Sequence, residues 1–313
     1  MMDGGELREV FGEALVELGQ KNPEVIVLDA DLSTSTRTSL FRERFPRRFI
    51  QCGIAECNMV SIAAGLAHLG YIPFPVTFAA FAARKALDQV YMAMAVQQDN
   101  IKLVGAYCGM TAGECGPSHN SGEDLAIMRA MPGLRVIDPA DGFELRSALF
   151  EAAAYRGPVY MRVSRITAVP LFREDHRFRW GGSEILREGE DIALFSTGMM
   201  TRPALETAEL LSAHGIQASV IHMPSVKPLD ADTILRYAER TRCVLTLENG
   251  RVAGGFGSAV CELLSAQRPT LIDMAGFEDT LILGAPVDDL LVYYRLTPSD
   301  LAKRATALVR RKN

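Results

Sequence analysis

The sequence lacks the features that mark membrane-spanning, secreted and nucleic-acid-binding proteins. It has no apolar run that approaches the roughly 20 residues needed to span a bilayer. The opening MMDGGELREV has neither the basic start nor the apolar stretch of a signal peptide. The net charge is −5, and no basic cluster is longer than the RRK near the C-terminal end. We therefore expect neither nucleic acid nor a membrane as a main partner.

The sequence also lacks paired cysteines. Its six cysteines form no CxxC pair. Neither the spacing of Cys52 and Cys57 nor that of Cys108 and Cys115 matches a zinc site. We therefore expect no metal ligands among the cysteines. Scattered, reduced thiols predict a cytoplasmic location.

The chain is long and apolar enough for two domains. It has 313 residues, of which 48% are hydrophobic, and domains average roughly 150 residues. In the first half, short runs that are apolar throughout alternate with helical patterns. The predicted strands are 25–28, 49–52, 101–107, 134–138 and 159–163, with a further strand ending near Phe78, and the predicted helices lie near 4–19, 57–69, 80–97, 121–130 and 141–155. This alternation predicts an α/β, doubly wound domain with a mainly parallel sheet buried on both faces.

A second α/β pattern follows a break rich in charge, proline and glycine at 168–184. We expect a first domain at 1–170, a linker at 171–186 and a smaller second domain at 187–313. The strands predicted in the second domain are 191–197, 216–222, 242–248 and 270–274, and the helices are 201–213, 230–239, 256–265 and 298–311. Both domains are thus expected to be doubly wound.

Three segments of the first domain carry residues that packing alone does not require. They are CGIAECN (52–58), PVTFAAFAARKALDQ (75–89) and YCGMTAGECGPSHNSGEDLAIMRAMPG (107–133). In an open parallel sheet, ligands bind at the carboxyl ends of the strands, where we expect all three segments. A carboxylate at Glu56, an aromatic pair at Phe78 and Phe81, and a histidine at position 119 would make a site for a flat heteroaromatic cofactor at that edge.

Each of these residues also has a plainer interpretation. Glu56 is equally explained as a carboxylate at a helix start, which the helix dipole favours. Phe78 and Phe81, three positions apart, suit core packing. His119 in its glycine-rich loop and Arg165 at a strand end could both be solvated. The residues taken singly leave these alternatives open, and only their order along the chain is distinctive.

That order resembles the C-terminal half of transketolase, a thiamine diphosphate enzyme. The resemblance rests on the following segments: LDADLSTS (28–35), FIQCGIAECNMVSIAAGLAHLGYIPFPVTFAAF (49–81), the DQ at 88–89, GPSH (116–119), MPGLRVIDPADGFE (131–144), GPVYMRVSR (157–165), DIALFSTGMMTRPALETAELL (191–211) and AGGFGSAVCELL (253–264). It covers essentially the whole chain. It implies a thiamine diphosphate pyrimidine-binding domain followed by a transketolase C-terminal domain.

The resemblance assigns cofactor roles to four residues. It implies that Glu56 contacts N1′ of the aminopyrimidine ring and activates the cofactor. Phe81, with Phe78 beside it, would stack against or enclose that ring, and Asp31 would lie near the cofactor. Family members commonly carry glutamine after the catalytic glutamate, whereas this chain has Cys57.

Substrate roles follow from the same resemblance. His119 would act near the reacting hydroxyl and carbonyl of the substrate, and Arg165 and Ser35 would hold a sugar phosphate. Tyr107 lies where some members have a phosphate-binding histidine. Cys115 replaces an aspartate that hydrogen-bonds a hydroxyl of the donor ketose, and a thiol makes only weak hydrogen bonds. These departures concern the substrate rather than the cofactor, and they leave the donor ketose and the acceptor open.

One element of the family is missing from the sequence. Members hold the cofactor diphosphate through Mg²⁺ with a GDG motif and a downstream asparagine, and no GDG occurs here. The resemblance therefore implies that a partner chain, the N-terminal transketolase subunit, supplies the diphosphate-binding domain and the Mg²⁺ ligands. An α2β2 heterotetramer is the simplest closed assembly. We expect a natural separate chain rather than a fragment, because MMDGGELREV opens a helix.

The sequence leaves three alternative functions. The first is the C-terminal subunit of a two-subunit transketolase, which transfers a two-carbon ketol unit from a ketose or ketose phosphate to an aldehyde. The second is a thiamine diphosphate enzyme subunit that decarboxylates a 2-oxoacid such as pyruvate and transfers its acetyl unit. The third, in a different class, is a non-catalytic interaction subunit on the same fold, which the presence of Glu56 argues against.

Overall fold

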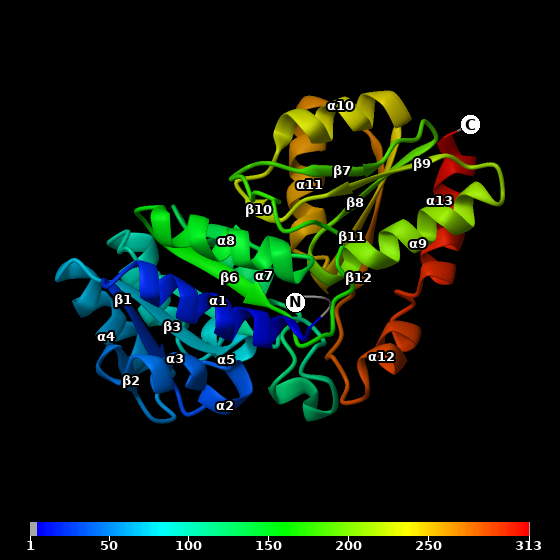
Figure 1. Ribbon diagram of the computed structural model, residues 1–313. Helices are drawn as coiled ribbons and strands as arrows, with labels where there is room; N and C mark the ends of the chain where they lie inside the picture. The colour runs from blue at the N-terminus through cyan, green and yellow to red at the C-terminus, as the bar shows by residue number, and fades with distance from the viewer. Residues whose placement is uncertain (1–4, 313) are drawn as a thin grey trace.

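The computed structural model describes residues 5–312 as two α/β domains that lie beside each other (Figure 1). The first domain contains a seven-stranded sheet in the order β10-β5-β6-β4-β3-β1-β2. Its strands are β1 (Val25–Asp29), β2 (Phe49–Gln51), β3 (Ile72–Phe78), β4 (Lys102–Ala106), β5 (Arg135–Ile137), β6 (Val159–Val163) and β10 (Ser225–Lys227). All neighbouring strands are parallel except β10, which is antiparallel to β5.

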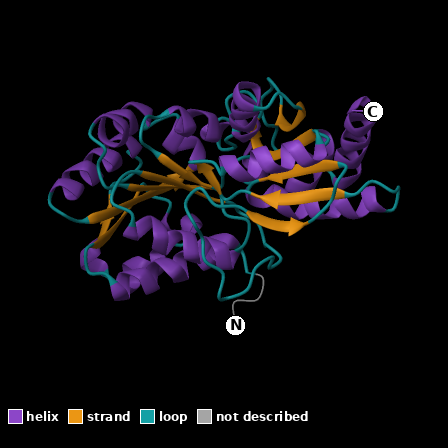
Figure 2. Cartoon of the chain, turned by 90° about the horizontal axis from the view of Figure 1, so that it is seen from above, coloured by secondary structure: helices purple, strands orange, loops and turns teal. Residues whose placement is uncertain are grey.

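Helices cover both faces of this sheet, which explains why its strands are apolar throughout (Figure 2). On one face the core includes side chains of α1 (Leu7–Lys21), α3 (Ser39–Arg44) and α8 (Gly142–Ala154). On the other face it includes side chains of α4 (Glu56–His68), α6 (Leu87–Val90), the π-helix η2 (Tyr91–Val96) and α7 (Asp124–Ala130). Short helices α2 (Ser33–Thr36), α5 (Ala79–Ala83) and η3 (Gly113–Ser118) follow β1, β3 and β4.

The second domain is built on a five-stranded sheet in the order β12-β11-β8-β9-β7, in which only β7 is antiparallel. Its strands are β7 (Glu184–Arg187), β8 (Ile192–Ser196), β9 (Ala218–His222), β11 (Cys243–Arg251) and β12 (Leu271–Phe277). Its helices are α9 (Thr201–Ser212), α10 (Ala231–Thr241), α11 (Phe256–Gln267), α12 (Val287–Tyr293) and α13 (Pro298–Lys312). The two doubly wound α/β domains expected from the sequence are confirmed.

The domains are joined by shared structure as well as by the chain between them. Strand β10 comes from the second half of the sequence but pairs with β5 of the first sheet. At the same seam, the fully buried guanidinium of Arg162 in β6 pairs with Asp124 at 2.8 Å and with Asp138 at 3.0 Å, and it donates to the backbone oxygen of Asn249 in β11. Charged groups that are paired and hydrogen-bonded in this way tolerate burial, so the seam is fixed by specific polar contacts.

Several elements differ from the sequence-based expectation. The single helix expected at 80–97 is divided into α5, α6 and the π-helix η2, with a break at 84–86. Helix α7 begins at Asp124 rather than near 121, because Ser121 instead pairs with Gly109 in an isolated bridge. Strand β7 begins at Glu184, inside the stretch expected to be a linker. The start of the helix expected at 4–19 lies outside the described residues.

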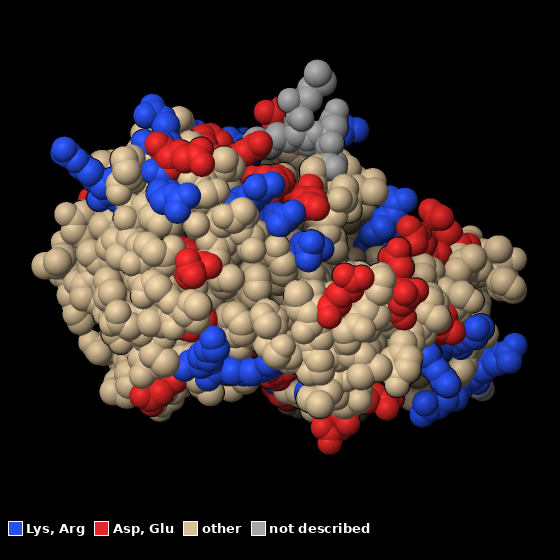
Figure 3. All heavy atoms as spheres, turned by 90° about the horizontal axis from the view of Figure 1, so that it is seen from below, with Lys and Arg blue, Asp and Glu red and all other residues tan. Residues whose placement is uncertain are grey.

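Two further observations concern the partners that the chain could contact. Across residues 5–312, no helix has the length and the apolar character that crossing a membrane requires. Figure 3 shows one face on which a broad area over the first domain carries few charged side chains. Depletion of charge is typical of the centre of a protein–protein interface, so such an area is suited to contact with another chain.

Candidate functional site

The three segments singled out in the sequence meet at one edge of the first sheet. Strand β3 ends at Phe78 and strand β4 ends at Ala106, immediately before Tyr107. Arg165 follows the end of β6 by two residues. Because neighbouring parallel strands end at the same edge, these residues lie together above the sheet. Phe78, Tyr107 and the partly buried Phe81 belong to a small apolar cluster that is separate from the main cores.

Glu56 is the first residue of α4 and is buried, with a relative exposure of 3%. The chain reaches it through Gly53, whose positive φ of 68° suits glycine. Lys85, at the break between α5 and α6, donates from Nζ to Glu56 Oε1 at 3.2 Å and to Oε2 at 3.5 Å. The helix N-terminus and this ammonium both interact favourably with the carboxyl group. A buried carboxyl group is therefore held at the mouth of the site.

Aromatic rings stand next to this carboxylate. Phe78 and Phe81 stack with ring centroids 5.6 Å apart, and the ring of Tyr107 stacks on Phe78 at 4.4 Å. The ammonium of Lys85 lies 4.0 Å from the centroid of the Phe81 ring. Such stacked faces provide apolar contact area at low cost in side-chain entropy. The pair that the sequence left open as mere core packing thus lines the candidate site.

His119 completes the aromatic group. It follows η3 in the glycine-rich loop, and its ring meets Phe81 edge-on at 5.2 Å and Phe78 at 6.0 Å. The hydroxyl of Ser118 lies 2.8 Å from His119 Nδ1. The imidazole is only partly buried, and within residues 5–312 its Nε2 makes no hydrogen bond, so a ligand or water can reach it. The structure therefore brings His119 together with the two phenylalanines.

Tyr107 links the site to the N-terminal helix. It has a positive φ of 56°, which is uncommon for a residue other than glycine and is often found at functional sites. Its hydroxyl accepts from Arg8 Nη1 at 2.9 Å and donates to the backbone oxygen of Ser35 at 3.3 Å. The exposed guanidinium of Arg165 lies 5.2 Å from the Tyr107 ring centroid. Arg8, Ser35 and Arg165 thus surround one tyrosine, and two of the three are cations.

Two of the predicted residues are less closely connected to this group. Within residues 5–312, the exposed Asp31 carboxylate makes no hydrogen bond or ion pair. Its backbone N–H donates to Gln51 Oε1 at 2.9 Å. The buried carboxylate at this strand end is Asp29, which accepts from Thr38 Oγ1 at 2.9 Å and fixes the turn after β1. Cys115 is exposed in η3, and its backbone oxygen accepts from the Ser118 hydroxyl at 3.4 Å.

Sequence reasoning did not single out Lys85, Arg84 or Arg8. The first two interrupt an otherwise alanine-rich stretch, FAARKA (81–86), and that interruption was the available signal. Arg8 carried no signal, because its partner Tyr107 is 99 residues away in the chain. All three lie beside the site, and each is paired with a carboxylate: Arg8 with Glu6, Arg84 with Glu123 and Lys85 with Glu56.

The donor set fits an aminopyrimidine better than it fits a metal ion. A buried carboxyl group can hydrogen-bond a ring nitrogen while aromatic faces pack on the ring. Among residues 5–312, no three His, Cys, Asp or Glu side chains are arranged to hold a metal. The residues present thus fit a flat heterocycle.

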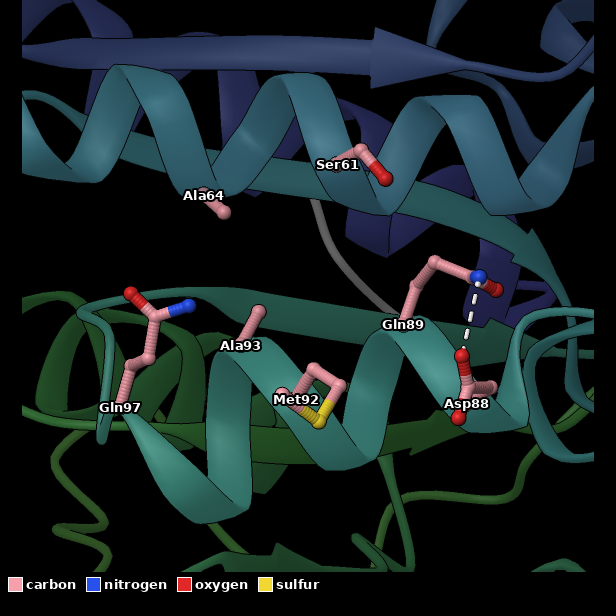
Figure 4. A pocket seen from close by; sticks show the side chains of 7 residues that line it. All are labelled: Ser61, Ala64, Asp88, Gln89, Met92, Ala93 and Gln97. Carbon is pink, nitrogen blue, oxygen red and sulfur yellow. Dashed lines mark hydrogen bonds between the residues drawn. The ribbon is translucent and has the colours of Figure 1, made fainter.

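A shallow groove lies on the outer side of the same domain, between α4 and the α6–η2 segment. Figure 4 shows Ser61 and Ala64 of α4 on one side of the groove and Met92 and Ala93 of η2 on the other. Large apolar side chains are exposed around these elements, namely Ile54, Leu69, Tyr91, Met92 and Val96. An apolar, exposed surface of this kind is typical of contact with another protein chain.

Comparison with known families agrees with this architecture. Residues 4–169 match the family model "Transketolase, pyrimidine binding domain". Residues 181–301 match the model "Transketolase, C-terminal domain". The two matches correspond to the two domains of the structure, and the candidate site lies in the pyrimidine-binding domain.

Individual relatives align over almost their whole length. The 6-deoxy-6-sulfo-D-fructose transketolase subunit SqwH of Clostridium sp. is 39% identical over 307 residues, covering 98% of this chain and 95% of the relative. An apulose-4-phosphate transketolase subunit of Phocaeicola vulgatus is 31% identical, with 97% of each chain covered. A solved structure described as a split gene transketolase, inactive beta4 tetramer, superposes with a TM-score of 0.93 at 41% identity, covering 99% of this chain and 100% of the other. The chain therefore belongs to the transketolase family and corresponds to its C-terminal half.

Proposed function

We propose that this chain is the C-terminal subunit of a two-subunit, thiamine diphosphate-dependent transketolase. It would transfer a two-carbon ketol unit from a ketose or ketose phosphate to an aldehyde. The observation that carries the proposal is Glu56, a carboxyl group buried at a helix start beside the stacked rings of Phe78 and Phe81. Burial of a carboxylate is costly, and recognition of a cofactor ring explains why one is retained there.

The residues divide into those that hold the cofactor and those that handle the substrate. Glu56 would hydrogen-bond the aminopyrimidine and share a proton with its ring nitrogen, while Phe78 and Phe81 pack on the ring. Asp31 would lie close to the cofactor. When bound, thiamine diphosphate supplies the nucleophilic carbon and the electron sink for cleaving the bond beside the ketose carbonyl.

The substrate would lie between the His119 loop and the cluster around Tyr107. His119 would hydrogen-bond the reacting oxygen and move a proton there, as an imidazole can near neutral pH. The guanidinium of Arg165 would hold a phosphate with two hydrogen bonds, assisted by Ser35 and by Tyr107. Cys115, exposed in the same loop, would contact the sugar weakly, which favours donors that differ from the ordinary ketose phosphates.

A partner chain completes the proposed enzyme. We propose that an N-terminal transketolase subunit supplies the diphosphate-binding domain and the ligands for Mg²⁺, in an α2β2 assembly. Two relatives support this, since each is named as a subunit and is matched over nearly its full length. The exposed apolar side chains around α4 and η2 provide a surface for such contacts. The related structure described as an inactive tetramer of one chain supports the view that the chain needs its partner.

Reconstitution tests this proposal directly. The chain would be mixed with a candidate N-terminal subunit, thiamine diphosphate and Mg²⁺, and assayed against a panel of free and phosphorylated ketoses. We expect ketol transfer by the mixture and none by either chain alone. Weighing the trapped covalent adduct distinguishes a two-carbon ketol unit from an acetyl unit derived from a 2-oxoacid. An acetyl adduct, or activity that survives Glu56→Ala, would contradict the proposal.

A further inference from the structure

Arg84 makes several hydrogen bonds to the loop that carries His119. Its Nη1 donates to the backbone oxygens of Pro117 at 3.0 Å and Ser118 at 3.3 Å. Its Nη2 donates to the backbone oxygen of Asn120 at 2.6 Å, and its Nε pairs with the carboxylate of Glu123. One guanidinium thus binds the carbonyls on both sides of His119.

No other side chain in the described part of the molecule makes the same set of contacts with this loop. Another side-chain attachment is made by Asn120, whose Nδ2 donates to Gly113 O and to Leu283 O, both at 3.1 Å. That contact ties the loop to the second domain, whereas Arg84 ties it to the end of α5, immediately after the helix that presents Phe81. Arg84 thus joins the loop of His119 to the end of the helix that presents Phe81.

The chemistry of the contact requires arginine. A guanidinium presents five N–H donors in a rigid plane, which can reach several carbonyl oxygens and a carboxylate at once. A lysine ammonium at the same position has three donors on a flexible stem and would not satisfy the same four acceptors. The side chain is 37% exposed and Glu123 is 25% exposed, so the contact is accessible to water and depends on its geometry rather than on deep burial.

We propose that Arg84 is a positioning residue for His119. It holds the imidazole edge-on to Phe81 by fixing the carbonyl groups of the two preceding residues and of the one that follows. Its effect on catalysis rests on the proposed ketol transfer, whereas its effect on the placement of His119 does not. Arg84 contacts neither the proposed cofactor ring nor the substrate, so it acts through His119.

Nuclear magnetic resonance of the isolated chain tests the placement. The ring protons of His119 lie close to the edges and faces of Phe78 and Phe81, so their chemical shifts are displaced by ring currents. We expect Arg84→Gln to move these signals to the values of a histidine in an unstructured peptide, and Arg84→Lys to move them part of the way. Signals that stay unchanged in both variants would overturn the proposal.

Arg304→Gln is the matched control. Arg304 has a similar exposure of 32% and likewise binds a carboxylate and a backbone oxygen, those of Asp273 and Met274, but it lies on α13 of the second domain. We expect it to leave the His119 signals unchanged. Thermal unfolding of each variant identifies any that fail to fold, and Arg84→Lys, which keeps the charge, serves if Arg84→Gln does not fold.

Kinetics of the reconstituted pair then measure the consequence. A misplaced catalytic group can slow a reaction on the order of 100-fold. We expect Arg84→Gln to lower kcat by roughly 10- to 100-fold with little change in KM for the donor or in thiamine diphosphate affinity, because it touches neither. If shifted His119 signals came with an unchanged kcat, the role of Arg84 in catalysis would be refuted. If even the wild-type pair transferred no ketol unit, the proposed function would fail while the placement result stood.

Discussion

Lys85 Nζ lies 3.2 Å from Glu56 Oε1 and 4.0 Å from the centroid of the Phe81 ring. The ammonium therefore occupies the space between the carboxyl group and the aromatic face that are proposed to receive the cofactor ring. It is 46% exposed, whereas the Glu56 side chain is 3% exposed. The exposed lysine side chain has room to move into solvent, whereas the buried glutamate does not. We therefore infer that Lys85 moves aside when a ligand enters.

Glu56→Gln should remove activity without unfolding the chain. Glutamine keeps the size of the side chain but cannot share a proton with the ring nitrogen, so we expect kcat of the reconstituted pair to fall on the order of 10²- to 10⁴-fold. Lys85 can turn to solvent, so the free energy of unfolding should change by about 1 kcal/mol or less. Ketol-transfer assays and urea unfolding measure the two quantities. Glu206→Gln, in an exposed pair with Arg202, is the control and should alter neither.

Lys85→Met should show how much the ion pair with Glu56 contributes to the free energy of unfolding. Removing the ammonium leaves a buried carboxylate without its cation, which we expect to lower the free energy of unfolding at neutral pH by about 1–2 kcal/mol. The combined change with Glu56→Gln should cost less than the sum of the single changes, because the uncompensated charge is then gone. Urea unfolding of the four proteins gives this coupling, and a coupling energy of zero would refute the contact.

The clustering of the site could be predicted from the sequence because it follows from the sheet. Runs such as 25–28 and 159–163, apolar at every position or nearly so, predicted buried parallel strands, and parallel strands place their carboxyl ends at one edge. That reasoning was enough to bring Glu56, Phe78 and the loop of His119 to one edge. The resemblance to a family then supplied roles, which composition and periodicity could not.

The contacts that shape the site could not be predicted, for physical reasons. Lys85 reaches Glu56 only because the helix expected at 80–97 breaks at 84–86, and a break without proline or glycine leaves little mark in the sequence. Strand β10 is three residues long, too short to show a period, and it forms by pairing with β5 across the domain seam. Such features depend on tertiary contacts rather than on local preference.

A buried carboxylate at the domain seam should give the protein a stability that depends on pH. Glu144 in α8 accepts from the backbone N–H of Ala140 at 2.8 Å and lies 2.7 Å from His222 Nε2 in β9 and 3.6 Å from His176 Nε2. Burial alone would raise the pKa of Glu144, but the facing imidazoles and the N–H outweigh it and lower that pKa to about 2. For His176 burial acts in the other direction and would lower the pKa, but the neighbouring Glu144 carboxylate outweighs burial and raises that pKa.

The pKa of Glu144 is lowered and that of His176 is raised, so together they define a pH range in which the pair is most stabilising. The lowered pKa of Glu144 contributes stability that is present above its usual value of 4.5 and is lost as the pH falls through about 2. The raised pKa of His176 contributes stability that is present below its usual value of 6.5 and is lost as the pH rises through its value in the folded protein. Glu144→Gln should therefore destabilise most between pH 4.5 and pH 6.5, by about 3 kcal/mol.

Urea unfolding of wild type and Glu144→Gln across pH 3 to 9, roughly the range in which these groups titrate, would measure the effect. The difference in the free energy of unfolding between the two proteins should become smaller at both ends of that pH range. Glu151→Gln, exposed on the same helix, is the control and should show a small difference that does not vary in this way. A constant difference between wild type and Glu144→Gln would mean that neither shift exists.

Arg165→Met should discriminate between phosphorylated and unphosphorylated donors. The guanidinium is exposed above the Tyr107 ring and forms no ion pair within residues 5–312. Hydrogen bonds to charged groups contribute about 1.5–3 kcal/mol, so we expect KM for a ketose phosphate to rise roughly 10- to 100-fold. For the corresponding free ketose, KM should stay nearly constant, because no phosphate is present to be held. Arg165→Lys should fall between, since an ammonium offers charge without the planar fork.

The comparison needs a control that separates a specific contact from the general loss of a positive charge. Arg173→Met removes an exposed arginine that belongs to none of the proposed contacts, and it should leave both KM values nearly unchanged. If Arg165→Met raised KM equally for the free and the phosphorylated ketose, Arg165 would be contacting the sugar itself. If it raised neither, the phosphate would have to be held by another cation, such as Arg8, whose Nη1 lies 2.9 Å from the Tyr107 hydroxyl. Steady-state kinetics on matched pairs of donors thus identify which end of the substrate Arg165 binds.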